Sequence, residues 1–317
     1  MENRQEEPRF SVIIVTCNRL ALLKECVAHA SNQEKMPEKI IIINNASTDG
    51  TLEYLQEEQF QSPLYHIVNE SENLGGAGGF SRGVETALAE KGDWFLLIDD
   101  DAMIASDFLS SIAEAVKSHP ECGAFTGVVE TEGQIDTLHR RRRKKAGSVQ
   151  MVNIPEEAYK REEFELDAAS FCGLVVGRKI VEKIGLPEKE FFIWNDDLEY
   201  SLRIRMHTEI RNINRARLNH KTNLYSQRSS KRYLWKDYYG FRNYFYTCRK
   251  YGNKTDCIMS YAIPRLRLIY WRMQHIISRK DYVYNLEMLK SLPERRETGK
   301  TGDCERIFSG IEVKRMK

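Results

Sequence analysis

The sequence predicts an α/β fold, a doubly wound and mainly parallel sheet, followed by a helical region. Short β-branched runs alternate with helical patterns over the first hundred residues, as in parallel sheets covered by helices. Polar residues follow directly after the buried runs, at the strand ends where such sheets bind ligands. Beyond about residue 222 this rhythm gives way to aromatic and basic residues.

The individual elements can be assigned in order along the chain. Buried apolar runs predict strands over 10–15, 40–43, 65–68, 94–98 and 170–176. Helices are predicted over 20–31, from Thr51, and over 83–90. The stretch 130–165 is irregular, and the helices resume beyond it. We therefore predict an α/β domain over 1–222 and a helical, basic region over 223–317.

Composition limits the classes of protein that fit. Among 317 residues, 48 Lys and Arg nearly balance 46 Asp and Glu. The balance is uneven, because Arg203–Lys280 holds 19 basic and only three acidic residues. No apolar stretch approaches the ~20 residues that span a bilayer, and the polar N-terminus does not resemble a secretory signal. Seven scattered cysteines without a Cys-x-x-Cys pair suit a reducing cytoplasm.

An acidic triplet, Asp99-Asp100-Asp101, follows the strand predicted over 94–98. Adjacent carboxylates repel one another unless a cation lies among them. Two carboxylates of this spacing suit Mg²⁺ or Mn²⁺, which bind hard oxygen ligands and substrate phosphates. The alternative is an acidic helix start, with Asp107 in the same role, since acids favour helix N-termini.

A glycine-rich stretch, Asn73–Gly83, carries five glycines in eleven residues. We expect a loop over 73–79 that lets the backbone approach an anionic ligand, with Arg82 as a diphosphate contact. The stretch matches neither the Walker nor the dinucleotide-binding pattern. The alternative is a flexible connection.

Three further features of the sequence stand out. Trp194-Asn195-Asp196-Asp197 forms a second acidic cluster with Glu199, in which a carboxylate next to a bound electrophile could act as a general base. His220 on its own is more often structural than a ligand. The basic run Arg140–Lys145 is typical of a solvated loop; binding of a polyanion or closure over an anionic substrate is the alternative.

Taken together, five motifs resemble family-2 glycosyltransferases, an inverting class with the Rossmann-like GT-A fold. The motifs are Phe10–Arg19, Ile40–Thr51, Asn73–Gly76, Ile98–Asp101 and Asn195–Arg203. The fuller glycine string, the Trp near an Asp-Asp-x-Glu-Tyr sequence, and the position of His220 are most similar to bacterial galactofuranosyltransferases. Rhamnosyltransferases that use dTDP-rhamnose are the second possibility.

The resemblance implies a role for each matching residue. Asp99, Asp101 and His220 would hold Mn²⁺ or Mg²⁺, and Asp197 would be the catalytic base. Asp196 and Trp194 would shape the acceptor site. The nucleotide sugar would contact Thr16, Arg19, Asn44, Asn45, Gly75, Gly76, Arg82, Asp99 and Asp100. Asn44 stands where such enzymes usually carry an Asp that accepts a hydrogen bond from the uracil N3–H.

The predicted function is therefore transfer of galactofuranose from UDP-galactofuranose to a saccharide, in bacterial surface polysaccharide synthesis. A non-catalytic nucleotide- or carbohydrate-binding relative and a polyanion-binding interaction protein are the rival classes. Aromatic residues interleaved with basic ones over 228–280 indicate inward-packed helices, or peripheral attachment to an anionic membrane that presents a lipid-linked acceptor. They carry no nucleic-acid recognition module.

Overall fold

The computed structural model describes residues 7–221 and 233–290, and the chain divides into two compact units. The first unit comprises Met1–Arg143, Met151–Lys189 and Asp197–Leu224, and the second comprises Lys144–Gln150, Glu190–Asp196 and Tyr225–Lys317. The second unit thus takes two short segments from the middle of the chain. The predicted boundary between residues 222 and 223 lies outside the described residues and stays a prediction.

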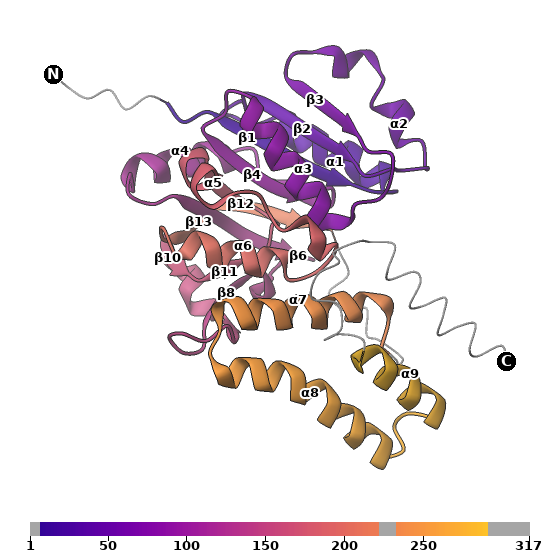
Figure 1. Cartoon of the computed structure of the whole chain (residues 1–317). Helices are drawn as coiled ribbons and strands as arrows, with labels where there is room; N and C mark the ends of the chain where they lie inside the picture. Colours follow the sequence, from indigo (N-terminus) through magenta and orange to yellow (C-terminus); the bar gives the residue numbers. More distant parts are fainter. Residues whose placement is uncertain (1–6, 222–232, 291–317) are drawn as a thin grey trace. The chain divides into compact units, whose positions relative to one another are not determined.

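The first unit is built on a large sheet with the main strand order β10-β13-β6-β12-β4-β1-β2-β3 (Figure 1). The strands on this path are β1 (Phe10–Thr16), β2 (Lys39–Asn44), β3 (Tyr65–Asn69), β4 (Trp94–Asp99), β6 (Ala124–Thr131), β10 (Glu163–Leu166), β12 (Leu174–Gly177) and β13 (Ile210–His220). Off the path, β5 (Ala102–Ile104) pairs with β13 and β7 (Gln134–Ile135) pairs with β6. A separate small sheet joins β11 (Ala168–Ala169), β8 (Arg140–Arg143) and β9 (Met151–Asn153).

The parallel half of the large sheet is the half that the alternating pattern predicts. β1 lies parallel between β2 and β4, and β3 continues the parallel order next to β2. β12 then runs antiparallel between β4 and β6, while β13 is parallel to β6. The fold class is confirmed, with a mixed second half.

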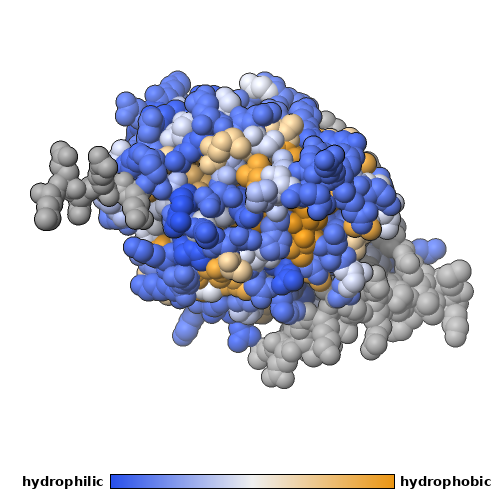
Figure 2. Space-filling view, turned by 90° about the horizontal axis from the view of Figure 1, so that it is seen from above, coloured by the Kyte–Doolittle hydropathy of each residue, from blue (hydrophilic) through white to orange (hydrophobic). Residues whose placement is uncertain are grey.

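Helices cover both faces of this sheet. They are α1 (Leu20–Ser31), α2 (Thr51–Tyr54), α3 (Gly75–Ala89), α4 (Phe108–Ser118), α5 (Arg178–Ile184) and α6 (Asp196–Arg205), with short 3₁₀ turns η1 (Glu58–Gln61), η2 (Thr137–His139), η3 (Glu156–Lys160) and η4 (Lys189–Phe191). In β1, Val12 packs in one apolar cluster with Leu23 of α1, whereas Ile13 packs in the other with Phe80 of α3. Burial on both faces explains the continuous apolar run of this strand. On the face seen in Figure 2, hydrophilic side chains predominate and apolar residues gather in limited patches.

The glycine-rich stretch is helical, so the prediction of a loop over 73–79 was wrong. Helix α3 begins at Gly75 and runs to Ala89. A Cβ at Gly79 would lie 2.5 Å from Val15 Cγ1, and one at Gly83 would lie 2.3 Å from Ile13 Cγ2. These glycines therefore let α3 lie directly on β1, and packing accounts for them.

The second unit holds α7 (Trp235–Tyr251), α8 (Lys254–Met273) and α9 (Arg279–Lys290). Its core contains Tyr233, Tyr238 and Tyr239 together with apolar residues of α8 and α9, so part of the aromatic set packs inward as expected. Other large side chains of this unit stay exposed, among them Trp235 and Tyr270. Among the described residues no helix is both long enough and apolar enough to cross a bilayer.

Candidate active site

The acidic triplet forms a turn between β4 and β5. Asp99 ends β4, while Asp100 and Asp101 are buried in the turn. Because β1 and β4 are adjacent and parallel, the residues after β1 reach the same edge. The Thr16 hydroxyl donates to Asp100 Oδ2 at 2.7 Å, and Arg19 Nη1 donates to Asp101 Oδ2 at 2.6 Å and to Asp100 Oδ1 at 3.1 Å.

The three carboxyl groups differ in how readily they ionise. Burial, together with the neighbouring Asp101 and Asp100, raises the pKa of Asp99 to about 7. Burial also raises the pKa of Asp100 to about 6, against the opposing effect of Thr16 and Arg19. Burial works against ionisation of Asp101 as well, but contacts with His220 and Arg19 outweigh it and hold its pKa below the usual range. The turn is therefore short of positive charge.

Strand pairing brings His220 to this turn. His220 ends β13 and lies opposite Ala102 of β5, which places its Nε2 3.3 Å from Asp101 Oδ1. Burial disfavours its protonation, yet the contact with Asp101 outweighs burial and raises the pKa of His220. Within the described part of the chain, Asp101 Oδ1 is buried and has no hydrogen-bond partner besides this contact with His220. Carboxylate oxygens and one imidazole nitrogen at this place fit Mn²⁺ or Mg²⁺.

Asn44 and Asn45 fix the start of α3. The Asn45 side chain donates to Gly75 O at 3.0 Å and accepts from Leu74 N at 2.9 Å. Asn44 donates to Asn69 Oδ1 at 2.9 Å, and its own oxygen accepts from Ser47 N at 3.1 Å. Both predicted site residues thus brace the strand ends around the glycine stretch.

Gly76 and Arg82 stand apart from the packing of α3. A Cβ at Gly76 would meet no atom within 4 Å, so the protein's own packing does not require glycine there. Arg82, predicted as a diphosphate contact, pairs with Glu70 at 3.0 Å and with Glu85 at 2.7 Å. The structure therefore places Arg82 against two carboxylates.

Asp197 is held by Arg141 of the basic run. Arg141 Nη2 lies 3.0 Å from Asp197 Oδ2, and Asp197 Oδ1 accepts from Leu198 N at 2.7 Å. Both oxygens are therefore oriented, and the side chain remains about one-fifth exposed. A carboxylate fixed in this way and open to solvent can accept a proton from a bound hydroxyl.

The basic run Arg140–Lys145 is not simply a solvated loop, so that expectation was wrong for its first residues. Arg140 lies in β8 and is fully buried. Its guanidinium donates to Gly127 O, Asn212 Oδ1, His139 O and Cys172 O. Because these acceptors satisfy the buried donors, the arginine joins the large and small sheets instead of facing water.

Trp194 and Asp196 belong to the second unit. Trp194 is 40% exposed, and it has a left-handed backbone, as do its neighbours Phe192 and Asn195. Such strained backbone conformations cluster at functional sites. The buried Asn243 side chain fixes this segment by donating to Phe191 O, Ile193 O and Trp194 O at 2.7–3.0 Å.

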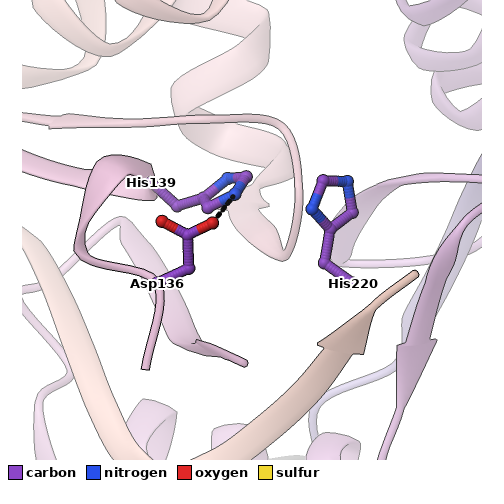
Figure 3. A group of neighbouring side chains, drawn as sticks. All are labelled: Asp136, His139 and His220. Carbon is purple, nitrogen blue, oxygen red and sulfur yellow. Dashed lines mark ion pairs between the residues drawn. The ribbon is translucent and has the colours of Figure 1, made fainter. Parts of the chain in front are cut away.

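Asp136 and His139, which sequence reasoning missed, form with His220 a group that could hold a metal ion. Their side chains and that of His220 point toward one another (Figure 3), and one ligand atom of each lies within 4.8 Å of the others. Burial lowers the pKa of His139, and the contact with His139 lowers the pKa of Asp136 to about 2. Only the Asp-x-x-His spacing before the basic run could have drawn attention to them.

Residues 11–185 match the model of glycosyl transferase family 2. Galactofuranosyltransferase GlfT1 of Mycolicibacterium smegmatis is 24% identical over 195 residues, which cover 61% of this chain and 64% of that protein. The GalNAc(5)-diNAcBac-PP-undecaprenol beta-1,3-glucosyltransferase of Campylobacter jejuni is 28% identical over 129 residues, 40% of this chain and 41% of the relative. These matches span less than two thirds of either relative.

Solved structures share the fold. TarS 1-349 of S. aureus in complex with UDP superposes with a TM-score of 0.56 at 14% identity, covering 90% of this chain and 83% of that one. GalNAc-T7 with UDP, GalNAc and Mn²⁺ gives a TM-score of 0.59 at 16% identity, covering 77% and 48%. At such identities the likeness establishes the GT-A fold alone.

Proposed function

Because this chain belongs to glycosyl transferase family 2, whose model covers more than half of it, we propose that it is a metal-dependent inverting glycosyltransferase. It moves a sugar from a nucleotide donor, preferably UDP-galactofuranose, to a saccharide hydroxyl. The observation that carries the proposal is the buried acidic turn, where Asp100 and Asp101 meet Thr16, Arg19 and His220. A turn short of positive charge suits a divalent cation, which would in turn bind the diphosphate, better than it suits a polyanion alone.

The donor site is formed by residues at and just beyond the ends of β1 and β2. Thr16 and Arg19 line the uridine pocket, and the Asn44 amide oxygen accepts a hydrogen bond from the base. Asn45 holds the start of α3 through Gly75. The amide groups at this helix start then face the anionic part of the donor, as helix N-termini do for phosphates generally.

Asp99, Asp101 and His220 would hold the divalent cation, Mn²⁺ or Mg²⁺. When bound, the ion supplies Lewis-acid stabilisation of the charge that develops on the leaving diphosphate. Arg19 lies at the same turn, at 2.6 Å from Asp101, and contributes a permanent positive charge there. A cation held here and Arg19 would together stabilise a departing nucleoside diphosphate.

Asp197 acts as the catalytic base. It takes the proton of the acceptor hydroxyl as the oxygen attacks the anomeric carbon, a role typically worth about 10²–10⁴-fold in rate. Arg141 and the Leu198 amide orient its two oxygens. Trp194 and Asp196 shape the acceptor site, and direct displacement inverts the anomeric configuration.

A panel of UDP- and dTDP-sugars with Mn²⁺ tests the donor. Transfer from UDP-galactofuranose above all others supports the proposal, and preferential transfer from dTDP-rhamnose would instead assign a rhamnosyltransferase. Mn²⁺-dependent UDP binding without transfer to any saccharide acceptor would favour a non-catalytic relative.

The same enzyme attaches peripherally to an anionic membrane through α8. Eight large apolar side chains on this helix are exposed, and at 3.6 residues per turn the seven other than Tyr261 share an arc of roughly 140°. These seven are Ile258, Met259, Ile263, Leu266, Ile269, Tyr270 and Met273. Arg265 and Arg272 flank the arc on one side and Arg267 on the other, as in interfacial amphipathic helices.

Charge favours a lipid surface over a second copy of the chain. The one acid of α8, Asp256, is buried and accepts hydrogen bonds from Ser148, Val149 and Gln150. Pairing two copies of this helix face would therefore bring arginines together. An anionic leaflet complements them, each basic residue near the surface contributing about 1 kcal/mol, and such a leaflet would present a lipid-linked acceptor.

Vesicle co-sedimentation tests the attachment. The full chain should bind phosphatidylglycerol vesicles more strongly than phosphatidylcholine vesicles, and Leu266→Glu with Met273→Glu should abolish the difference. Met206→Glu replaces an equally exposed side chain of the first unit and should bind as the wild type does. Equal binding to both vesicle types, or concentration-dependent dimers that the double variant removes, would overturn the attachment.

A further inference from the structure

His220 presents its two ring nitrogens to two different groups of side chains. Nε2 lies 3.3 Å from Asp101 Oδ1. Nδ1 is buried and has no hydrogen-bond partner within residues 7–221 and 233–290, and a ring nitrogen of His220 faces Asp136 and His139 in Figure 3. A buried nitrogen without a partner is costly, so it marks a place for an ion or a water molecule.

Neighbouring groups fix the side chains of Asp136 and His139. In this orientation Asp136 Oδ2 and His139 Nε2 lie close to each other. Asp136 Oδ1 accepts from Leu138 N at 3.0 Å, and Thr131 donates to Oδ2 at 3.2 Å. His139 Nδ1 lies 2.7 Å from Ser170 Oγ, which leaves Nε2 at 3.4 Å from Asp136 Oδ2. Zinc–nitrogen bonds of about 2.1 Å in a tetrahedron place ligand atoms about 3.4 Å apart, so these two atoms already have the required separation.

We propose that Asp136, His139 and His220 form a second cation site, distinct from the aspartate turn, that takes a nitrogen-preferring divalent ion such as Zn²⁺. Two imidazoles and one carboxylate suit zinc and its neighbours in the transition series, whereas the oxygen-rich Asp99 and Asp101 suit Mn²⁺ or Mg²⁺. Ser170 orients His139 as outer hydrogen bonds orient metal-binding histidines. Three protein ligands leave a fourth position for water.

The second site is coupled to the first through His220, a step that rests on the proposed function. A neutral imidazole has one lone pair. When Nδ1 binds Zn²⁺, Nε2 carries the proton and donates it to Asp101, so His220 cannot also bind the cation at the aspartate turn. Zn²⁺ in the second site therefore weakens binding of Mn²⁺ in the first.

Calorimetric titration of Zn²⁺ into the full chain without nucleotide tests the site. His139→Gln and Asp136→Asn should each weaken Zn²⁺ binding at least about tenfold, whereas Asp99→Asn should leave it unchanged. His119→Gln is the matched control, because His119 contacts Glu163 and Glu121 at the surface and reports adventitious binding. Asn at position 136 can still cap η2, so this variant carries the test even if His139→Gln folds poorly.

The outcomes separate the second site from the proposed function. Wild-type affinity in both His139→Gln and Asp136→Asn would mean that water alone occupies the place, and loss of Zn²⁺ binding in Asp99→Asn would assign the ion to the aspartate turn. Either result overturns the second site. Zn²⁺ binding is measured without donor or acceptor, so failure of sugar transfer would leave it standing. Mn²⁺ titrations with and without saturating Zn²⁺ then test the coupling.

Discussion

Replacing Gly76 by alanine separates the two roles that the glycines of α3 play. Gly76 has open space where a Cβ would stand, whereas a Cβ at Gly83 would lie 2.3 Å from Ile13 Cγ2. Alanine is favoured over glycine inside a helix by up to about 1 kcal/mol. Gly76→Ala should therefore raise the melting temperature by up to about 2–4 °C. Gly83→Ala gains the same helix preference but adds an overpacking cost of about 1–3 kcal/mol, so its melting temperature should fall or stay level.

Although Gly76→Ala should be more stable, it should bind the nucleotide donor less tightly. If the donor diphosphate approaches the backbone at Gly76, the added methyl group occupies that space. UDP binding in the presence of Mn²⁺, measured by calorimetry, should weaken at least about tenfold, or about 1.4 kcal/mol. A Gly76→Ala protein that is more stable and binds UDP as tightly as the wild type would refute the close approach.

Three further outcomes follow from the acidic residues. Asp197→Asn keeps the hydrogen-bonding shape but cannot accept the proton, so transfer should fall at least about 10²-fold while UDP binding is retained; unchanged turnover would remove Asp197 as the base. Asp101→Ala should abolish the Mn²⁺ dependence of UDP binding, and calorimetry with and without Mn²⁺ checks this. The metal-free protein should lose stability as pH rises from about 4 to 7, because Asp99, with a pKa raised to about 7, binds more protons when folded than when unfolded. In Asp99→Asn, urea unfolding at several pH values should show a shallower loss, and an unchanged slope would contradict this reason.

The elements whose residues show a local apolar pattern could be predicted from the sequence. The buried strands were predicted because runs such as 10–15 are continuously apolar, and α1 because 20–31 carries a helical period. The acidic turn was also predictable, since it follows a strand directly. The helical glycine stretch was not, because its cause is the close packing of Gly79 and Gly83 on β1, a contact between distant parts of the chain.

The same limit explains the missed residues of the site. Arg140 looks like part of a charged surface run, and only tertiary structure supplies the four acceptors that allow it to be buried. Asp136 and His139 form a group only with His220, which lies more than 80 residues later and comes near them through the pairing of β13 with β6. Chemistry that depends on such pairings is not readable from spacing.

Residues 144–150 and 190–196 belong to the second unit although they lie in the middle of the chain. They limit how this protein can be recombined with its relatives. A chimera that exchanges α7–α9 alone would separate the Asn243 carboxamide from the carbonyls of residues 191, 193 and 194. It would also separate Asp256 from Ser148 and Val149. Each buried polar group left unpaired costs about 1–3 kcal/mol. Exchange of this unit between glycosyltransferases therefore requires residues 144–150 and 190–196 to travel with the helices, and Trp194 travels with them.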